Sequence, residues 1–145
     1  MADVHAGVLK RSLVTTVRPR VLLADDYAKI LVALDRLLKP TCDIVGQVTD
    51  GSALVDAVAT LRPDVVVVDL FMPNVDFRTT YARLRQVAPE TKIVVVTAAD
   101  DASIRDEALQ AGASAFVPKH RLVDDLWPAI QSCVGQGVQP PQGTG

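Results

Sequence analysis

The sequence predicts a doubly wound α/β domain, with five parallel strands in the order 2-1-3-4-5 and five helices. Short aliphatic runs alternate with stretches of helical periodicity between residues 20 and 134. Two of these runs, Val65–Val68 and Ile93–Val96, consist of β-branched residues alone, which is typical of strands buried on both faces of a parallel sheet. Regular alternation of strands and helices indicates crossover connections within one sheet. A closed eight-stranded barrel needs about 250 residues, more than the 145 present.

Two strand–helix pairs begin the predicted domain. The first strand, Val21–Ala24, ends at an acidic pair and is followed by a helix that stops at Pro40. Ile44–Val48 is the second strand, and a turn at Asp50–Ser52 starts a helix that ends before Pro63. The apolar faces of these two helices consist of Ile30, Leu31, Leu34, Leu37, Leu38, Leu54, Val55, Val58 and Leu61.

The second half of the predicted domain contains three strands and three helices. The strands are Val65–Val68, Ile93–Val96 and Ala115–Val117. The helix after the third strand ends at Pro89, and the next ends at Gly112, a residue common after the last helical turn. The apolar faces of the three helices consist of Tyr81, Leu84, Val87, Ile104, Ala108, Leu109, Leu122, Leu126, Ile130 and Val134.

These patterns predict a domain over residues 20–134, an N-terminal extension over residues 1–19, and a flexible tail or linker remnant over residues 135–145. The tail consists mainly of Gly, Gln and Pro, a composition that cannot bury a core.

Composition excludes several classes of function. Hydrophobic residues make up 49% and charged residues 22% of the chain, with a formal charge of -2, so a basic nucleic-acid-binding surface is not expected. No apolar stretch reaches the roughly 20 residues that span a bilayer, and the N-terminus lacks the apolar core of a signal peptide. We therefore expect a cytoplasmic protein that binds neither nucleic acid nor a membrane. Cys42 and Cys133 lie far apart without clustered histidines, which predicts free thiols rather than zinc ligands.

Polar residues with complementary chemistry follow four of the five predicted strands. Asp25 and Asp26 follow the first, Asp69 ends the third, Thr97 ends the fourth and Lys119 follows the fifth. The carboxyl ends of parallel strands lie at one edge of the sheet, where ligands bind at the topological switch point. Singly, each residue type is ordinary at a strand end or helix start. Their shared edge is what indicates a functional site.

Three neighbouring carboxylates repel one another, and a site made of oxygen ligands and water favours Mg²⁺. The metal, the Lys119 ammonium and the Thr97 hydroxyl could together hold the oxygens of a phosphoryl group in transfer. One carboxylate must then be the nucleophile. Asp69 is the best placed, because the central strand holds it rigidly.

The chain resembles the receiver domain of two-component response regulators over about residues 20–134. The resemblance rests on four segments: Val21–Asp26, Asp69–Pro73, Thr97–Ala99 and Ala111–Lys119. It implies the flavodoxin-like receiver fold and a phosphoryl group accepted from a sensor histidine kinase. Leu109–Phe116 is similar to receivers that are joined to helix-turn-helix output domains.

The resemblance also implies a role for each residue of the metal site. Asp69 corresponds to the phosphoacceptor, Asp26 to the acid that contacts Mg²⁺ directly, and Asp25 to the acid that acts mainly through water. Phe71 contributes its backbone carbonyl to the metal.

Thr97, Lys119 and Phe116 correspond to the residues that respond to phosphorylation. Thr97 is the switch hydroxyl, Lys119 the ammonium that pairs with the phosphoryl group, and Phe116 the switch aromatic, a position that a plain core residue could also fill. Phosphorylation would shift these residues and the face formed by the fourth helix, fifth strand and fifth helix, through which such domains dimerise or bind partners.

Three departures from the family pattern stand out. Phe77 follows Asp76 where the family carries glycine, which predicts a rebuilt loop because positive φ becomes costly. Lys119 is followed by His120 rather than by proline, so the cis peptide often found there is not expected to be held by a proline. Phe71 and Ala99 offer no polar group to orient water, which predicts a long-lived phosphoryl group.

Several functions remain open at this stage. The chain is expected to act as a stand-alone receiver or as the receiver of a transcription regulator whose DNA-binding domain is missing here. The alternative is a receiver-like module that binds partners without phosphorylation. A hydrolase with an aspartyl-phosphate intermediate would need a second Asp at position 71, which is Phe71. We therefore predict no independent enzyme activity.

Overall fold

The computed structural model describes residues 18–136 and contains one five-stranded parallel sheet in the order β2-β1-β3-β4-β5. This confirms the predicted fold and strand order. The proposed N-terminal extension up to residue 17 and the tail from residue 137 lie outside the described residues. No helix within the described range is long and apolar enough to cross a membrane.

The strands and helices alternate along the chain as the sequence predicts. In chain order they are β1 (Arg20–Ala24), α2 (Ala28–Leu38), β2 (Asp43–Val48), α3 (Gly51–Leu61), β3 (Val65–Asp69), α4 (Phe77–Val87), β4 (Lys92–Thr97), α5 (Ala102–Ala111), β5 (Ala115–Pro118) and α6 (Leu122–Gln136). A short 3-10 helix, η1 (Lys119–Arg121), connects β5 to α6. The sequence analysis missed η1 because three residues are too few to show a period.

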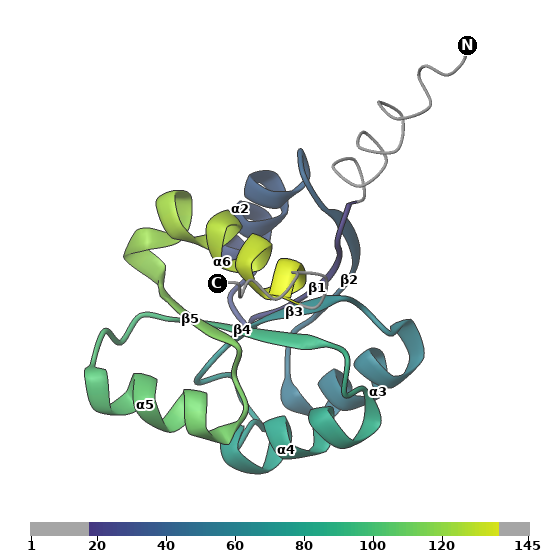
Figure 1. Cartoon of the computed structure of the whole chain (residues 1–145), viewed down its shortest axis with the longest axis vertical. Coiled ribbons are helices and arrows are strands. Elements are labelled where there is room, and N and C mark those ends of the chain that lie inside the picture. The colour runs from purple at the N-terminus through teal and green to yellow at the C-terminus, as the bar shows by residue number, and fades with distance from the viewer. Residues whose placement is uncertain (1–17, 137–145) are drawn as a thin grey trace, which may run out of the picture.

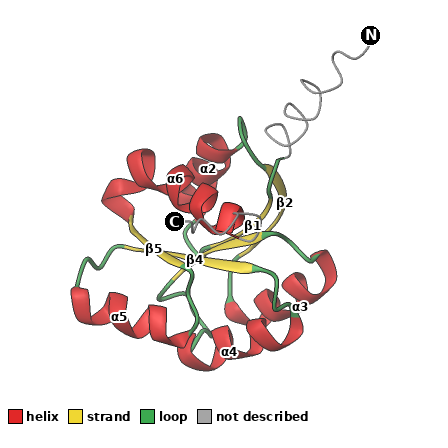
Figure 2. Cartoon of the chain, viewed as in Figure 1, coloured by secondary structure: helices red, strands yellow, loops and turns green. Residues whose placement is uncertain are grey.

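Helices cover both faces of the sheet, with α2 and α6 on one face and α3, α4 and α5 on the other (Figure 1). The central strand β3 shows why its sequence is wholly aliphatic. Val66 and Val68 pack with α3, α4 and α5, whereas Val65 and Val67 pack with α2 and α6, and all four are fully buried. The loops that leave the carboxyl ends of the strands connect this sheet to the helices (Figure 2).

The loop after β3 does not need the glycine that it lacks at position 77. Phe77 is the first residue of α4 and Asp76 precedes it with φ −96°. The positive φ in this loop belongs to Asn74, at 62°, and asparagine tolerates that conformation better than most residues. No cis peptide bond occurs between residues 18 and 136.

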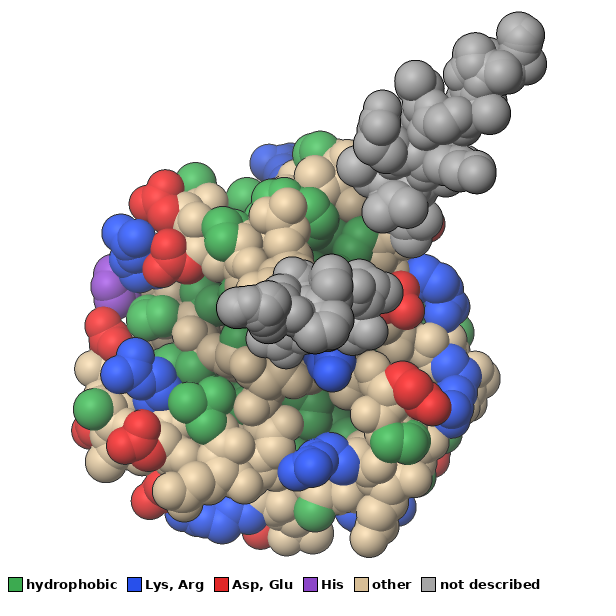
Figure 3. Space-filling view, viewed as in Figure 1, with side chains coloured by type: hydrophobic (Ala, Val, Ile, Leu, Met, Phe, Trp, Pro, Cys, Tyr) green, Lys and Arg blue, Asp and Glu red, His purple; other side chains and the backbone are tan. Residues whose placement is uncertain are grey.

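Charged side chains of both signs are interspersed over the face of the molecule drawn in Figure 3, without a broad patch of one sign. This distribution fits the small net charge of -2.

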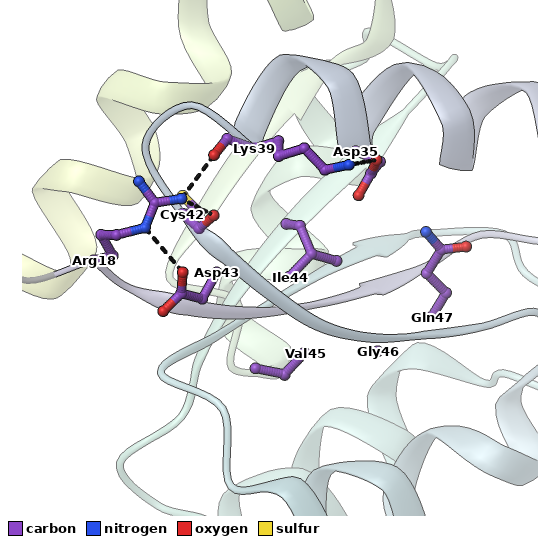
Figure 4. A pocket seen from close by; sticks show the side chains of 9 residues that line it. All are labelled: Arg18, Asp35, Lys39, Cys42, Asp43, Ile44, Val45, Gly46 and Gln47. Carbon is purple, nitrogen blue, oxygen red and sulfur yellow. Dashed lines mark hydrogen bonds and ion pairs between the residues drawn. The ribbon is translucent and has the colours of Figure 1, made fainter.

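Arg18, just before β1, contacts the turn between α2 and β2. Its guanidinium donates to the carbonyl oxygens of Lys39 and Cys42 and to the carboxylate of Asp43 (Figure 4). It also donates to the carbonyl oxygen of Pro40. The residues around it line an open cavity of about 480 Å³. Cys42 is buried beside this turn, and both Cys42 and Cys133 are free thiols, as predicted.

Candidate functional site

Asp25 and Asp26 leave the carboxyl end of β1 in different environments. Asp25 is fully buried, whereas Asp26 is exposed. The backbone N–H of Asp25 donates to the carbonyl of Val48 at 3.1 Å. Asp25 Oδ1 accepts from the N–H of Tyr27 at 2.9 Å, which fixes the side chain. Asp25 Oδ2 is buried and has no geometrically aligned hydrogen-bond donor among the described residues.

Lys119 lies between the two buried carboxylates at the carboxyl edge of the sheet. Its Nζ is 3.0 Å from Asp25 Oδ2 and 3.2 Å from Asp69 Oδ1. The structure thus brings together the carboxylates and the ammonium that the sequence placed at the ends of β1, β3 and β5.

Burial and neighbouring charges set the pKa values of this cluster. Burial raises the pKa of the Asp69 carboxyl; the charges of Asp25 and Asp26 add to this effect and the Lys119 ammonium opposes it. Burial alone would lower the pKa of Lys119, but the carboxylates of Asp25 and Asp69 outweigh it, so the pKa of Lys119 is raised. One ammonium therefore leaves the negative charge of the cluster incompletely balanced.

The three carboxylates can hold a divalent cation. Oxygen atoms of Asp25, Asp26 and Asp69 all lie within 4.8 Å of one another. Two oxygens bound directly to one Mg²⁺ lie at most about 4.2 Å apart, because each bond is close to 2.1 Å. Oxygens this close can share one Mg²⁺, bound directly or through water. A donor set made of oxygens alone, with the buried Asp25 Oδ2 facing the cluster, fits Mg²⁺.

The remaining residues of the predicted site lie around this cluster. Thr97 is buried at the end of β4, and its hydroxyl accepts from the N–H of Ala99 at 3.1 Å. The Thr97 hydroxyl thus forms its hydrogen bond with the loop that follows β4 and not with Asp69. Phe116, on β5, is half-buried and packs against the core under α3, α4 and α5. The Phe71 side chain is 57% exposed, so a contribution to a metal would come from its backbone.

Two further residues near the site were not predicted from the sequence to belong to it. His120 Nε2 lies 3.8 Å from Asp100 Oδ2, which links the segment after Lys119 to the loop after Thr97. Tyr81, on α4, is fully buried, and its hydroxyl has no hydrogen-bond partner among the described residues. Burial, followed by the charge of Asp69, raises the pKa of Tyr81. The helical periodicity predicted Tyr81 as a core residue. Periodicity cannot predict that the side chain lies near the carboxylate of Asp69.

A doubly wound sheet with an acidic cluster and a lysine at its carboxyl edge is the arrangement expected of a signalling domain of the two-component type. The chain belongs to the response regulator receiver domain family, whose model matches residues 21–131. It is therefore a receiver domain of two-component response regulators, as the sequence resemblance implied.

Individual relatives agree with this assignment. The chain is 32% identical over 126 residues to the response regulator MprA of Mycolicibacterium vanbaalenii, a match that covers 87% of this chain and 54% of that protein. It is 34% identical over 120 residues to the transcriptional regulatory protein PdtaR of Mycobacterium tuberculosis, covering 81% and 57% of the two chains. The chain thus spans little more than half the length of these curated relatives.

Solved structures show the same fold. The response regulator domain of Thermotoga maritima CheB superposes with a TM-score of 0.74 at 27% identity, covering 81% of this chain and 97% of that one. The signal receiver domain of Mycobacterium tuberculosis NarL gives a TM-score of 0.70 at 27% identity, covering 79% and 97%.

Proposed function

We propose that this receiver domain accepts a phosphoryl group on Asp69 from a sensor histidine kinase, with Mg²⁺ as the cofactor. The observation that carries the proposal is the position of the Lys119 ammonium, 3.2 Å from Asp69 and 3.0 Å from Asp25, at the edge where Asp26 also lies. A cytoplasmic location forms part of the same proposal.

The chemistry follows from the positions of these side chains. An Asp69 oxygen attacks phosphorus while the bond to the donor nitrogen breaks, and the electron pair of that bond leaves with the imidazole of the kinase. Lys119 stays beside the new acyl phosphate and stabilises its oxygens. When bound, Mg²⁺ would supply positive charge against the transferred oxygens. Asp26, Asp25 through water, and the carbonyl of Phe71 would hold it.

The response to phosphorylation would begin at Thr97. Its hydroxyl hydrogen is free to be donated, because the bond with Ala99 uses the oxygen as an acceptor. A phosphoryl group on Asp69 would offer that hydroxyl a strong acceptor and favour an arrangement in which Thr97 turns toward it and Phe116 repacks. The face formed by α5, β5 and α6 would then bind a second copy or an output protein. Leu109 on α5 and Val123 on α6 are exposed apolar residues of these helices.

Intact mass after incubation with acetyl phosphate tests the proposal. Wild type should gain the mass of one phosphoryl group when Mg²⁺ is present and none when it is chelated. Asp69→Asn should gain nothing, and Asp26→Asn should need more Mg²⁺. Asp56→Asn is the matched control, because Asp56 is an exposed carboxylate on α3, and it should behave as wild type.

A folded wild type that gains no phosphoryl group at any Mg²⁺ concentration would contradict the proposal. The chain would then be a module that binds partners without phosphorylation.

A further inference from the structure

The connection between β2 and α3 contacts both loops that carry the proposed metal ligands. At one end, the carbonyl of Val48 accepts the N–H of Asp25 at 3.1 Å. At the other end, the N–H of Gly51 donates to the carbonyl of Pro73 at 2.9 Å. Asp25 belongs to the loop after β1, and Pro73 to the loop that follows Asp69. Residues 48–51 therefore bridge the two halves of the acidic site.

Gly51 allows the second of these loops to lie directly on the start of α3. Gly51 is buried, and a Cβ built on it would lie 2.6 Å from the carbonyl carbon of Asn74 and 2.6 Å from Cγ2 of Val75. It would lie closer still to the carbonyl oxygen of Asn74. Backbone atoms cannot move aside as the end of a flexible side chain can. Any side chain at position 51 must therefore displace the loop.

The loop itself is a tight turn with little freedom to absorb that displacement. The N–H of Val75 donates to the carbonyl of Met72 at 3.2 Å, and Asn74 is in the left-handed conformation with φ 62°. The displacement would pass along Pro73 and Met72 to Phe71 and Asp69.

Helix propensity does not explain a glycine here. Gly51 is the first residue of α3, and Asp50 already caps this helix by accepting from the N–H groups of Ser52 and Ala53. Alanine is favoured over glycine in helices. On local grounds, Gly51→Ala would therefore be neutral or stabilising. The close approach of the loop is what requires glycine.

We propose that Gly51 is a positioning residue for the divalent-cation site, because it sets the place of the loop that carries Phe71 relative to Asp25 and Asp26. The inference rests on the proposed function only in requiring that this edge binds Mg²⁺. It does not require that phosphoryl transfer occurs.

Calorimetric titration of Mg²⁺ into the folded protein is the first test. Gly51→Ala should raise the Mg²⁺ dissociation constant on the order of tenfold, the usual cost of disturbing the support of a metal ligand. Gly135→Ala is the matched control, because a Cβ at Gly135 meets nothing within 4 Å, and it should match wild type. A Gly51→Ala protein that binds Mg²⁺ within twofold of wild type overturns the inference.

The Mg²⁺ dependence of phosphorylation separates positioning from general destabilisation. In Gly51→Ala the Mg²⁺ concentration for half-maximal acetyl phosphate reaction should rise, and excess Mg²⁺ should restore much of the rate. A purely structural role would lower the folded fraction without changing that concentration, and this result would also overturn the inference. If wild type binds Mg²⁺ but accepts no phosphoryl group, the proposed function fails while calorimetry still decides the role of Gly51. A wild type that binds no Mg²⁺ overturns both.

Variants of Asn74 test the same geometry from the loop side and replace Gly51→Ala if that protein does not fold. Asn74→Val places a β-branched residue at positive φ, which forces the turn to change, so Mg²⁺ affinity should fall. Asn74→Gly keeps the conformation accessible and should bind Mg²⁺ within twofold of wild type. Equal Mg²⁺ affinity in both variants would show that the loop position does not control the site.

Discussion

The ammonium of Lys119 lies 3.0 Å from Oδ2 of Asp25, a buried oxygen with no other partner among the residues described. Lys119→Met should therefore leave the buried carboxylates of Asp25 and Asp69 without a neighbouring positive charge. We expect a loss of about 1–3 kcal/mol in the free energy of unfolding at neutral pH without Mg²⁺, measured by urea denaturation.

Two comparisons separate this effect from the loss of any lysine. Lys29→Met removes an exposed lysine from α2 and should cost little. The double variant Lys119→Met/Asp25→Asn should recover part of the lost stability, because one of the two buried charges is gone. Equal stability of Lys119→Met and wild type without Mg²⁺ would contradict the pairing.

The raised pKa of Asp69 predicts how stability depends on pH. Burial holds the folded pKa above the unfolded value of 3.8. Between these two values the folded state binds more protons than the unfolded state, so stability falls as pH rises. Asp69→Asn lacks this titration. Without Mg²⁺, the variant should gain stability relative to wild type as pH rises from about 4 to 7, measured by urea unfolding at each pH.

Mg²⁺ provides the control for this pH dependence. A cation that binds the ionised cluster stabilises wild type by mass action, and Asp69→Asn should gain less from it. A stability difference between the two proteins that stays constant from about pH 4 to 7 without Mg²⁺ would contradict a perturbed Asp69.

The buried hydroxyl of Tyr81 predicts a stabilising substitution. It has no hydrogen-bond partner among the described residues, although the ring packs into the core and lies 5.9 Å from the ring of Phe77. Tyr81→Phe keeps the ring and removes the desolvated hydroxyl, so the free energy of unfolding should rise by about 1 kcal/mol. Tyr27→Phe, at an exposed tyrosine, should leave it unchanged. A loss of stability in Tyr81→Phe would show that the hydroxyl has a partner such as an ordered water.

Two apolar residues in the loops after β3 and β4 predict a long-lived phosphoryl group. Phe71 lies two positions after Asp69 and Ala99 two positions after Thr97, and neither offers a polar side-chain atom to hold an attacking water. Phe71→Asn should shorten the half-life of the phosphorylated protein severalfold, followed by intact mass after removal of the phosphodonor. Phe71→Leu keeps an apolar side chain and should decay at the wild-type rate. Rapid decay of the wild-type phosphoprotein would contradict the prediction.

The sequence predicted the sheet order and the edge where the acidic residues meet, because both depend on local patterns. Aliphatic runs such as Val65–Val68 mark buried strands, and parallel strands necessarily present their ends at one edge. The contacts of Lys119 with Asp25 and Asp69 follow from that rule, although their distances do not.

Contacts between segments that are far apart in the chain could not be predicted in this way. The approach of Asn74 to Gly51 depends on the shapes of two loops, and neither loop has a period. The 3-10 helix η1, which follows Pro118, could not be predicted either, because its three residues show no period. Arg18 is a clearer case, because its contacts cross 21 to 25 positions of the sequence.

Arg18 predicts a contribution to stability that is separate from the acidic site. Its guanidinium donates to the carbonyls of Lys39 at 2.7 Å, Pro40 at 3.0 Å and Cys42 at 2.7 Å, where α2 ends and β2 begins. Of the three, the Lys39 carbonyl lies at the C-cap of α2, where the helix end carries a partial negative charge. Arg18→Ala should lower the free energy of unfolding by about 1–2 kcal/mol, a value reduced for partial exposure. Arg18→Lys should not restore it, because an ammonium cannot match three acceptors with a planar fork.

The control for Arg18 is Arg36→Ala, which removes an exposed arginine from α2 and should have little effect on urea unfolding. The rate of Asp69 phosphorylation by acetyl phosphate should be the same in Arg18→Ala, Arg36→Ala and wild type at a temperature where all three are folded. A change in that rate would mean that the turn between α2 and β2 is coupled to the acidic edge through β2. Equal stability of Arg18→Ala and Arg36→Ala would mean that water satisfies the three carbonyls as well as the guanidinium does.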